Sequence, residues 1–352
     1  MYRLFLFVCV LFFQTVQVQS SEKHVFHKDI YIEARDGVSL RLAYVPANSF
    51  LSDFTSHESP QKVIIFVPGR TSCVENNYDL ALRLAGHNLQ ESKVSFPTTS
   101  FDFWGIDNRG HGKSGGRLEI DDGIHDQRCH IDSFATYIDD LHQALGVIKK
   151  GYKEQKVEYV LMGMSMGGNI VLNYLQDYDT ALAMPFKRAI VISPMVKFLT
   201  PGFPELGAFA LANIATYCGF GEWFIPGHGP RDLSDEAFES YTGSHNREDF
   251  LKQQAFFRRH PSMITEGATY GWIKAAFEAV TVLEQMQESP VPVSAFLAGD
   301  DRHVDTIAAY NFLTRLKAKI FIYDDAFHVL TREPEAYVPN FWQELFKELE
   351  KD

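Results

Sequence analysis

Short apolar segments alternate with amphipathic helical segments along most of this chain, and this alternation restricts the fold more than any other feature. Residues 63–67 read Val-Ile-Ile-Phe-Val, a continuous apolar run that is typical of a strand buried on both faces of a parallel sheet. In 131–149 the apolar residues recur at the three- and four-residue spacing of a helix. We therefore predict an α/β architecture, in which a mostly parallel sheet is covered by helices on both sides.

The same reasoning gives the approximate bounds of the regular elements. Strands are predicted at residues 29–34, 38–45, 63–67, 101–106, 157–162, 188–192, 291–297 and 319–323. Helices are predicted at residues 131–149, 168–178, 270–286, 305–316 and 335–349. Arg35-Asp36-Gly37 is typical of a hairpin turn between the first two strands.

One long segment interrupts the alternation. Residues 195–266 contain no sheet-like strand, many aromatic residues and several Pro and Gly. A structureless loop of this length is unusual in a compact domain, so we predict an inserted, mainly helical cap there, called the cap segment below. The α/β core would then consist of residues 21–194 and 267–352. Insertions of this kind sit above the strand ends, where open α/β sheets bind ligands.

The N-terminus carries the pattern of a leader. A short positive start at Arg3 precedes ten apolar residues, 4–13, and a polar stretch follows. The pattern predicts a secretory signal peptide over residues 1–20, and the apolar run is shorter than the roughly 20 residues of a membrane span. An uncleaved N-terminal anchor is the alternative. We expect a secreted or periplasmic protein, with membrane association left open.

Charge and cysteine content exclude some classes of function. The net charge of −12, without any basic run, argues against a nucleic-acid-binding protein. Cys73, Cys129 and Cys218 remain after the leader, and either one disulfide with a free thiol or three buried thiols with no bond fits this odd number. No pair of them has metal-ligand spacing, and neither a metal nor a cofactor is predicted.

Gly163-Met164-Ser165-Met166-Gly167 is the motif that carries most chemical information. It matches G-x-S-x-G between a predicted strand and a predicted helix, which is the context that a nucleophile elbow requires. The backbone passes so close to its neighbours there that side chains two before and two after the serine must be absent. We predict that Ser165 is the nucleophile of a serine hydrolase with the α/β-hydrolase fold.

A serine nucleophile needs a base and an acid, which follow it in this order: serine, acid, histidine. His328 follows the last predicted strand and is the expected base. Asp300 and Asp301 both follow the strand at 291–297, and spacing within the loop leaves the choice between them open. Asp305 is the expected N-cap of the next helix. The other downstream histidines belong to the cap segment or the acid loop: His228, His245, His260 and His303.

Two backbone N–H groups are expected to form the oxyanion hole. One is that of Met166, and the other is that of Arg70, whose loop Pro68-Gly69-Arg70 follows the buried strand at 63–67. The segment 107–114 ends in Gly-Lys-Ser like a phosphate loop, but Asp107 stands where that motif requires Gly. We therefore interpret 107–114 as a tight structural turn rather than a nucleotide site.

Taken together, these motifs resemble the lysophospholipase and monoacylglycerol lipase branch of the α/β hydrolases, a serine aminopeptidase S33-type domain. The resemblance covers nearly the whole chain after the leader and rests on these segments: Pro-Gly-Arg at 68–70, Asp-Asn-Arg-Gly-His-Gly-Lys-Ser at 107–114, the helix start at 131–141, Met-Ser-Met-Gly-Gly at 164–168, Ser-Pro-Met at 193–195, Thr-Tyr-Gly-Trp at 269–272 and Ala-Phe-His at 326–328. In this family the acid precedes Arg, with a second Asp four residues later. Asp301-Arg302 and Asp305 are similar to that arrangement, which favours Asp301 over Asp300. Two departures are a shorter acid loop and a longer connection at residues 87–100.

The resemblance implies hydrolysis of fatty-acyl esters of lysophospholipids or monoacylglycerols through an acyl-enzyme, with transient contact to a membrane surface. The aromatic cap segment would bind the acyl chain, although it could also pack on itself as a satellite core. Alternatives within the fold are another carboxylesterase or a proline-type aminopeptidase. An inactive binding protein on the same scaffold is the alternative of another class. The head group, acyl length and oligomeric state do not follow from the sequence.

Overall fold

A computed structural model describes residues 28–47, 61–87, 100–119, 127–152, 155–177 and 184–351. The predicted signal peptide and most of the long connection at 87–100 lie outside these residues. Within the part of the chain that is described, no helix combines the length and the apolar character needed to cross a bilayer.

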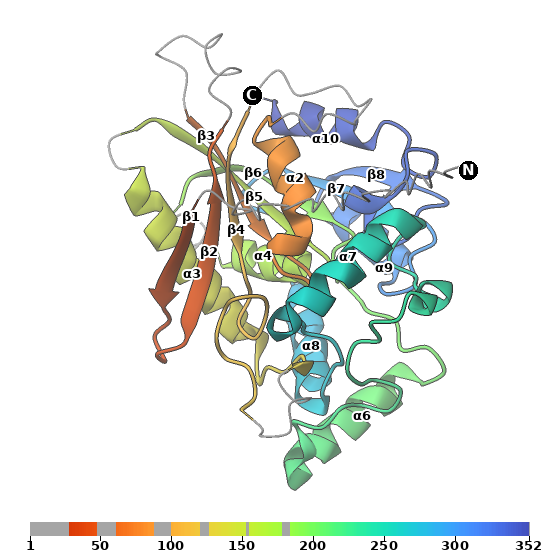
Figure 1. Cartoon of the computed structure of the whole chain (residues 1–352). Helices are drawn as coiled ribbons and strands as arrows, with labels where there is room; N and C mark the ends of the chain where they lie inside the picture. The colour runs from red at the N-terminus through yellow and green to blue at the C-terminus, as the bar shows by residue number, and fades with distance from the viewer. Residues whose placement is uncertain are drawn as a thin grey trace, which may run out of the picture.

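The described residues form an eight-stranded sheet in the order β1-β2-β4-β3-β5-β6-β7-β8 (Figure 1). Its strands are β1 (Lys28–Glu33), β2 (Ser39–Val45), β3 (Gln61–Val67), β4 (Asp102–Ile106), β5 (Val157–Met164), β6 (Phe186–Ile192), β7 (Val293–Ala298) and β8 (Lys319–Tyr323). β2 pairs antiparallel with both β1 and β4, and the other neighbours are parallel. The predicted fold class is confirmed: this is the α/β-hydrolase architecture.

Helices cover both faces of this sheet. One face is covered by α3 (Phe134–Gly151), α4 (Met166–Gln176), α8 (Tyr270–Leu283) and α9 (Thr306–Arg315), and the other by α2 (Tyr78–Leu84) and α10 (Phe341–Leu349). The apolar run of β3 shows why the sheet is buried twice. Val63 and Ile65 pack with the first group of helices, whereas Ile64 and Phe66 pack with the second.

The starts of three helices can be compared with the prediction from the sequence. The side chain of Asp305 caps α9 by accepting a hydrogen bond from the backbone N–H of Ala308 at 2.9 Å, as predicted. α10 begins six residues later than predicted, because Asn340 adopts a left-handed conformation (φ 63°) directly before Phe341. α2 was not predicted, since its seven residues are too few to show a helical period.

The cap segment contributes helices but none of the eight strands. It contains α6 (Glu205–Ala215), α7 (Arg247–Arg259) and the short helical turns η3 (Thr216–Phe220), η4 (Glu236–Ser240) and η5 (Pro261–Met263). In Figure 1 α6 lies at the lower end of the molecule and α7 crosses in front of the sheet. The division of the chain into a core and a cap stays a prediction.

The three described cysteines are free thiols. Cys73 and Cys129 are buried in the protein interior, and Cys218 is exposed next to α6. The structure therefore contains no disulfide among them, which is the second of the two arrangements left open by the sequence. Cys218 differs from that expectation, because it is exposed rather than buried.

Candidate active site

Ser165 occupies a strained turn between β5 and α4. Its backbone has φ 54° and ψ −119°, a conformation that residues other than glycine rarely adopt. A side chain at Gly163 would overlap the backbone of Gly167, and one at Gly167 would overlap the carbonyl oxygen of Val67. The two glycines of the motif are thus explained by close backbone packing, as the sequence predicted.

His328 and Asp301 are hydrogen-bonded to each other. The Nδ1–H of His328 donates to Oδ2 of Asp301 at 2.6 Å, and the Asp301 side chain is 1% exposed. The other oxygen, Oδ1, accepts the backbone N–H groups of His303 at 2.8 Å and Val304 at 3.0 Å. Burial acts to raise the pKa of Asp301, but the charge and hydrogen bond of His328 and these two N–H groups outweigh it, so the pKa is lowered.

Asp300, the competing carboxylate, points elsewhere. It pairs with Arg302 at 2.9 Å, and both side chains are about half exposed. The structure therefore brings Asp301, not Asp300, to His328. The Asp301 carboxylate is oriented by its own loop, because the two backbone N–H groups fix one of its oxygens and leave the other facing the imidazole.

The expected oxyanion-hole residues lie beside Ser165. A Cβ added to Gly69 would stand 3.1 Å from the Cβ and 3.7 Å from the Oγ of Ser165, so this loop passes the serine at van der Waals distance. Met166 is the first residue of α4, and the first N–H groups of a helix have no partner within the helix. The sequence assigned no role to the Arg70 side chain, yet its Nη1–H donates to the carbonyl of Glu266 at 2.7 Å and its guanidinium carbon lies over the Trp272 ring, 5.3 Å from the ring centroid.

Parallel pairing explains why these loops meet. β3, β5, β6, β7 and β8 run in the same direction, so their carboxyl ends share one edge of the sheet. Gly69, Ser165, Asp301 and His328 all follow these ends. Such an edge is where open α/β sheets bind their ligands. The catalytic roles of these residues stay predictions.

A second histidine, His303, stands next to the first; sequence reasoning placed it in the acid loop and gave it no role. The ring of His303 lies 4.9 Å from that of His328, measured between centroids. Its Nε2 is 3.1 Å from Oγ1 of Thr242 in the cap segment. The sequence signal was its position two residues after the acid, where its backbone N–H also binds Asp301.

The turn at 107–114 is held by charge pairs. The Arg41 side chain is fully buried and forms ion pairs with Asp107 at 3.1 Å and Glu75 at 2.8 Å. Lys113, the lysine of the Gly-Lys-Ser sequence, also pairs with Glu75, at 2.8 Å, and with Asp29, at 2.9 Å. These contacts agree with a structural turn rather than a phosphate loop.

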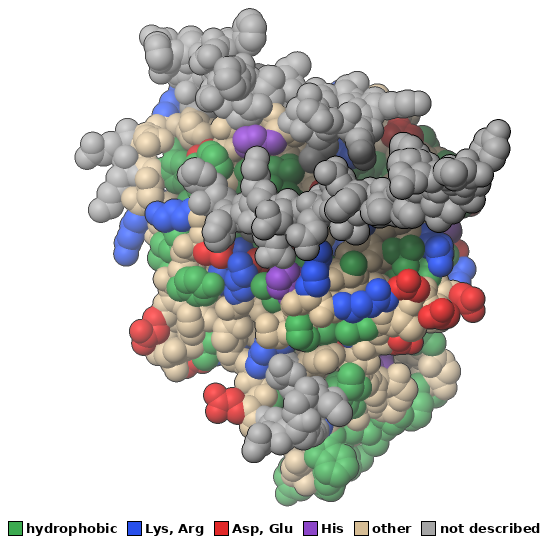
Figure 2. Space-filling view, in the orientation of Figure 1, with side chains coloured by type: hydrophobic (Ala, Val, Ile, Leu, Met, Phe, Trp, Pro, Cys, Tyr) green, Lys and Arg blue, Asp and Glu red, His purple; other side chains and the backbone are tan. Residues whose placement is uncertain are grey.

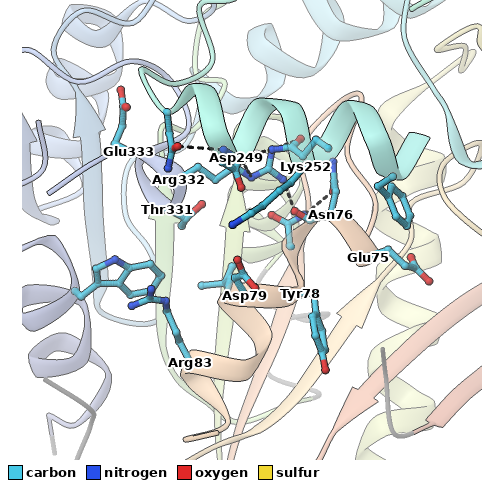
Figure 3. A pocket seen from close by; sticks show the side chains of 16 residues that line it. Glu75, Asn76, Tyr78, Asp79, Arg83, Asp249, Lys252, Thr331, Arg332 and Glu333 are labelled. Carbon is cyan, nitrogen blue, oxygen red and sulfur yellow. Dashed lines mark hydrogen bonds and ion pairs between the residues drawn. The ribbon is translucent and has the colours of Figure 1, made fainter. Parts of the chain in front are cut away.

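A polar cavity of about 330 Å³ lies between α2, α7 and α10 (Figure 3). Its charged lining residues are Glu75, Asp79, Arg83, Asp249, Lys252, Arg332 and Glu333. Ser165, Asp301 and His328 are not among the residues that line it, so this cavity is distinct from the candidate active site. Within the described residues, no group of three or more His, Cys, Asp or Glu side chains is arranged to hold a metal ion.

Comparison with known families decides the assignment. The sequence profile described as "Serine aminopeptidase, S33" matches residues 58–335, which is more than half of the chain. The protein belongs to this family. Its sequence is also similar to lysophospholipase L2 of Escherichia coli K12, with 25% identity over 253 residues. This match covers 69% of the present chain and 65% of the relative, slightly less than two thirds of the relative's length.

Solved structures agree on the fold. A soluble variant of the monoglyceride lipase of Saccharomyces cerevisiae, in complex with a substrate analog, superposes with a TM-score of 0.64 at 16% identity, covering 91% of this chain and 94% of that one. The monoacylglycerol lipase of Paleococcus ferrophilus superposes with a TM-score of 0.61 at 16% identity, covering 88% and 98%. At this identity the likeness shows the α/β-hydrolase fold that both share with this protein.

Proposed function

We propose that the protein is a serine hydrolase that cleaves fatty-acyl esters of lysophospholipids or monoacylglycerols. The observation that carries this proposal is the buried Asp301–His328 hydrogen bond, at the same edge of the sheet as the strained Ser165. Family membership and the sequence similarity to a lysophospholipase support it.

The proposed reaction passes through an acyl-enzyme. Because Nδ1 of His328 donates to Asp301, Nε2 is the nitrogen that would take the proton of the Ser165 hydroxyl. The serine Oγ then bonds to the ester carbonyl carbon, and the N–H groups of Arg70 and Met166 stabilise the oxyanion. The protonated His328 returns the proton to the leaving alcohol as the ester C–O bond breaks. A water molecule, activated in the same way, releases the fatty acid.

An apolar surface on the cap segment supports a lipid substrate and transient contact with a membrane. Tyr217 is 94% exposed, Leu206 79% and Ile214 62%, and they belong to α6 and η3. Figure 2 shows hydrophobic side chains gathered at the lower end of the molecule, where α6 lies in Figure 1. Soluble proteins expose contiguous apolar surface mainly where they bind a partner or a membrane. We name as the apolar surface Leu199, Phe203, Leu206, Leu211, Ile214, Tyr217, Phe220 and Trp223. Secretion, inferred from residues 1–20, is part of the same proposal.

A fluorophosphonate probe tests the serine-hydrolase part of the proposal. We expect covalent labelling of the wild-type protein and none of S165A. Absence of labelling in the folded wild-type protein would favour a binding protein without catalysis.

A substrate panel tests the lipid part. Lysophosphatidylcholine and a long-chain monoacylglycerol are compared with short p-nitrophenyl esters and with a proline p-nitroanilide. We expect the highest kcat/KM for the two long-chain esters. A flat preference for short esters would indicate another carboxylesterase, and cleavage of the anilide would indicate an aminopeptidase.

A further inference from the structure

Glu333 is a buried carboxylate on the loop that carries His328. Its side chain is 0% exposed and accepts four hydrogen bonds. Oε1 accepts the backbone N–H of Phe327 at 2.6 Å and Nδ1–H of His245 at 2.9 Å. Oε2 accepts the backbone N–H of His245 at 2.8 Å and the hydroxyl of Ser244 at 3.0 Å. These four hydrogen bonds offset the cost of burying the Glu333 carboxylate.

These bonds fix the chain on both sides of the candidate base. Phe327, the residue before His328, donates its N–H to Glu333. Val329, the residue after it, donates its N–H to the carbonyl of Gly243 at 2.7 Å. Glu333 and residues 243–245 of the cap segment thus hold His328 from both neighbours, whereas Asp301 holds only its ring.

His245 completes the contact by stacking. Its ring lies between that of Phe327, at a centroid distance of 3.7 Å and an angle of 19°, and that of Tyr337, at 3.8 Å and 2°. Rotation of the imidazole would therefore require the two flanking rings to separate. In Figure 3 Arg332 reaches toward Asp249 under α7, while the Glu333 carboxylate is turned away from them.

We propose that Glu333, together with His245, is the positioning unit of the catalytic base, and that it couples the cap segment to the geometry of His328. The proposal rests on the proposed function for the role of His328. Glu333 touches neither the reacting atoms nor His328 itself, so it acts through the backbone of 327–329. A displacement of the cap segment would be transmitted to the base along this path.

The variant E333Q isolates this role with little change in volume. An amide has one acceptor oxygen, so its NH₂ group must face a backbone N–H, either that of Phe327 or that of His245. The loop must then shift to separate two donors. A misplacement of about 1 Å at a catalytic group costs on the order of 10²-fold in rate, so we expect kcat to fall by roughly 10- to 100-fold with KM nearly unchanged.

Glu348 supplies a matched control. It is also buried, and it accepts hydrogen bonds from Ser294 at 2.9 Å and from Lys319 and Lys351. Ser294 and Lys319 lie at the starts of β7 and β8, whereas the candidate active site follows the ends of these strands. E348Q should lower the melting temperature without changing kcat. Substrate-independent readouts are the rate of fluorophosphonate labelling and the far-downfield proton resonance of His328 Nδ1–H, assigned by its absence in D301A.

The expected result is slower labelling and a shifted or missing resonance in E333Q, with both unchanged in E348Q. If E333Q does not fold, H245F replaces it, because Phe keeps the ring stack and removes one donor to Glu333. Labelling and resonance that are unchanged in the folded variant would overturn the proposal. If the wild-type protein cleaves no lipid ester, the proposed function fails, whereas the resonance still tests the positioning role.

Discussion

Asn in place of Asp301 should inactivate the enzyme while leaving the fold intact. Oδ1 of Asp301 accepts two backbone N–H groups, from His303 and Val304, and these donors remain in the variant. They require an oxygen at that position, so the Asn NH₂ group is forced to the Oδ2 position, 2.6 Å from Nδ1 of His328. Nδ1 must then accept a hydrogen bond, and the ring proton moves to Nε2. In this tautomer Nε2 has no lone pair with which to take the Ser165 proton.

The size of the effect follows from this change of tautomer. In chymotrypsin-like serine proteases, the same replacement of the triad Asp by Asn lowers kcat by roughly 10⁴. A similar loss here corresponds to about 5 kcal/mol of transition-state stabilisation. kcat on a p-nitrophenyl ester measures it, with circular dichroism and melting temperature as the check on folding.

D300N is the control for D301N. Asp300 pairs only at the surface with Arg302, and exposed pairs contribute about 0–1 kcal/mol, so kcat should stay within about twofold. A loss of less than tenfold in folded D301N, or an equal loss in D300N, would refute the assignment of the acid.

Three further predictions concern stability and lipid contact. Burial lowers the pKa of His111 to about 4, so as the pH falls from 6.5 to 4 the unfolded chain binds this proton and the folded protein does not, and His111 alone should lower the free energy of unfolding by about 3 kcal/mol. His228 and His303 titrate in the same range, so H111Q should reduce the slope in urea titrations at successive pH values by the contribution of one proton. G167A should lower the melting temperature and abolish probe labelling, because its Cβ would overlap backbone carbonyls, whereas G146A on α3 has open space and should be neutral or stabilising by up to about 1 kcal/mol. Ile214→Ser combined with Tyr217→Ser should slow hydrolysis of a vesicle-bound monoacylglycerol and leave a soluble p-nitrophenyl ester unaffected.

A specific result would contradict each of these three predictions. A pH slope that is the same in H111Q and the wild-type protein would show that His111 does not contribute to it. Normal labelling of G167A would mean that the elbow tolerates a side chain. Equal loss on vesicles and on the soluble ester would indicate damage to the site rather than to membrane contact.

Local patterns in the sequence predicted most of the fold, because most of the strands and longer helices carry their own periodicity. The run at 63–67 became β3, buried on both faces, and the elbow followed from two glycines whose absence of side chains is required locally. The late start of α10 was missed, since a left-handed Asn340 is not visible in an apolar pattern. α2 was missed because seven residues are too short to show a period.

The choice between Asp300 and Asp301 shows where local reasoning ends. Both carboxylates have the same place after β7, and position in the loop alone left them equal. The structure separates them by the direction of one loop, in which the N–H groups of His303 and Val304 draw Asp301 inward. The contacts between His245 and Glu333 could not be predicted, since they join residues that are 88 positions apart.

The candidate site is held by bonds between loops as well as within them. Asn108 of the 107–114 turn donates from Nδ2 to the carbonyl of Pro68 at 3.0 Å, so the turn that resembled a phosphate loop supports the loop Pro68-Gly69-Arg70 instead. Arg70 ties the same loop to the end of the cap segment through Glu266, and Glu333 ties the loop of His328 to the cap segment. Each of these contacts joins segments that are far apart in sequence, so each is a tertiary contact that the fold must bring together. The geometry of Ser165, Asp301 and His328 therefore depends on tertiary contacts, and a substitution in a distant loop can change it without touching Ser165.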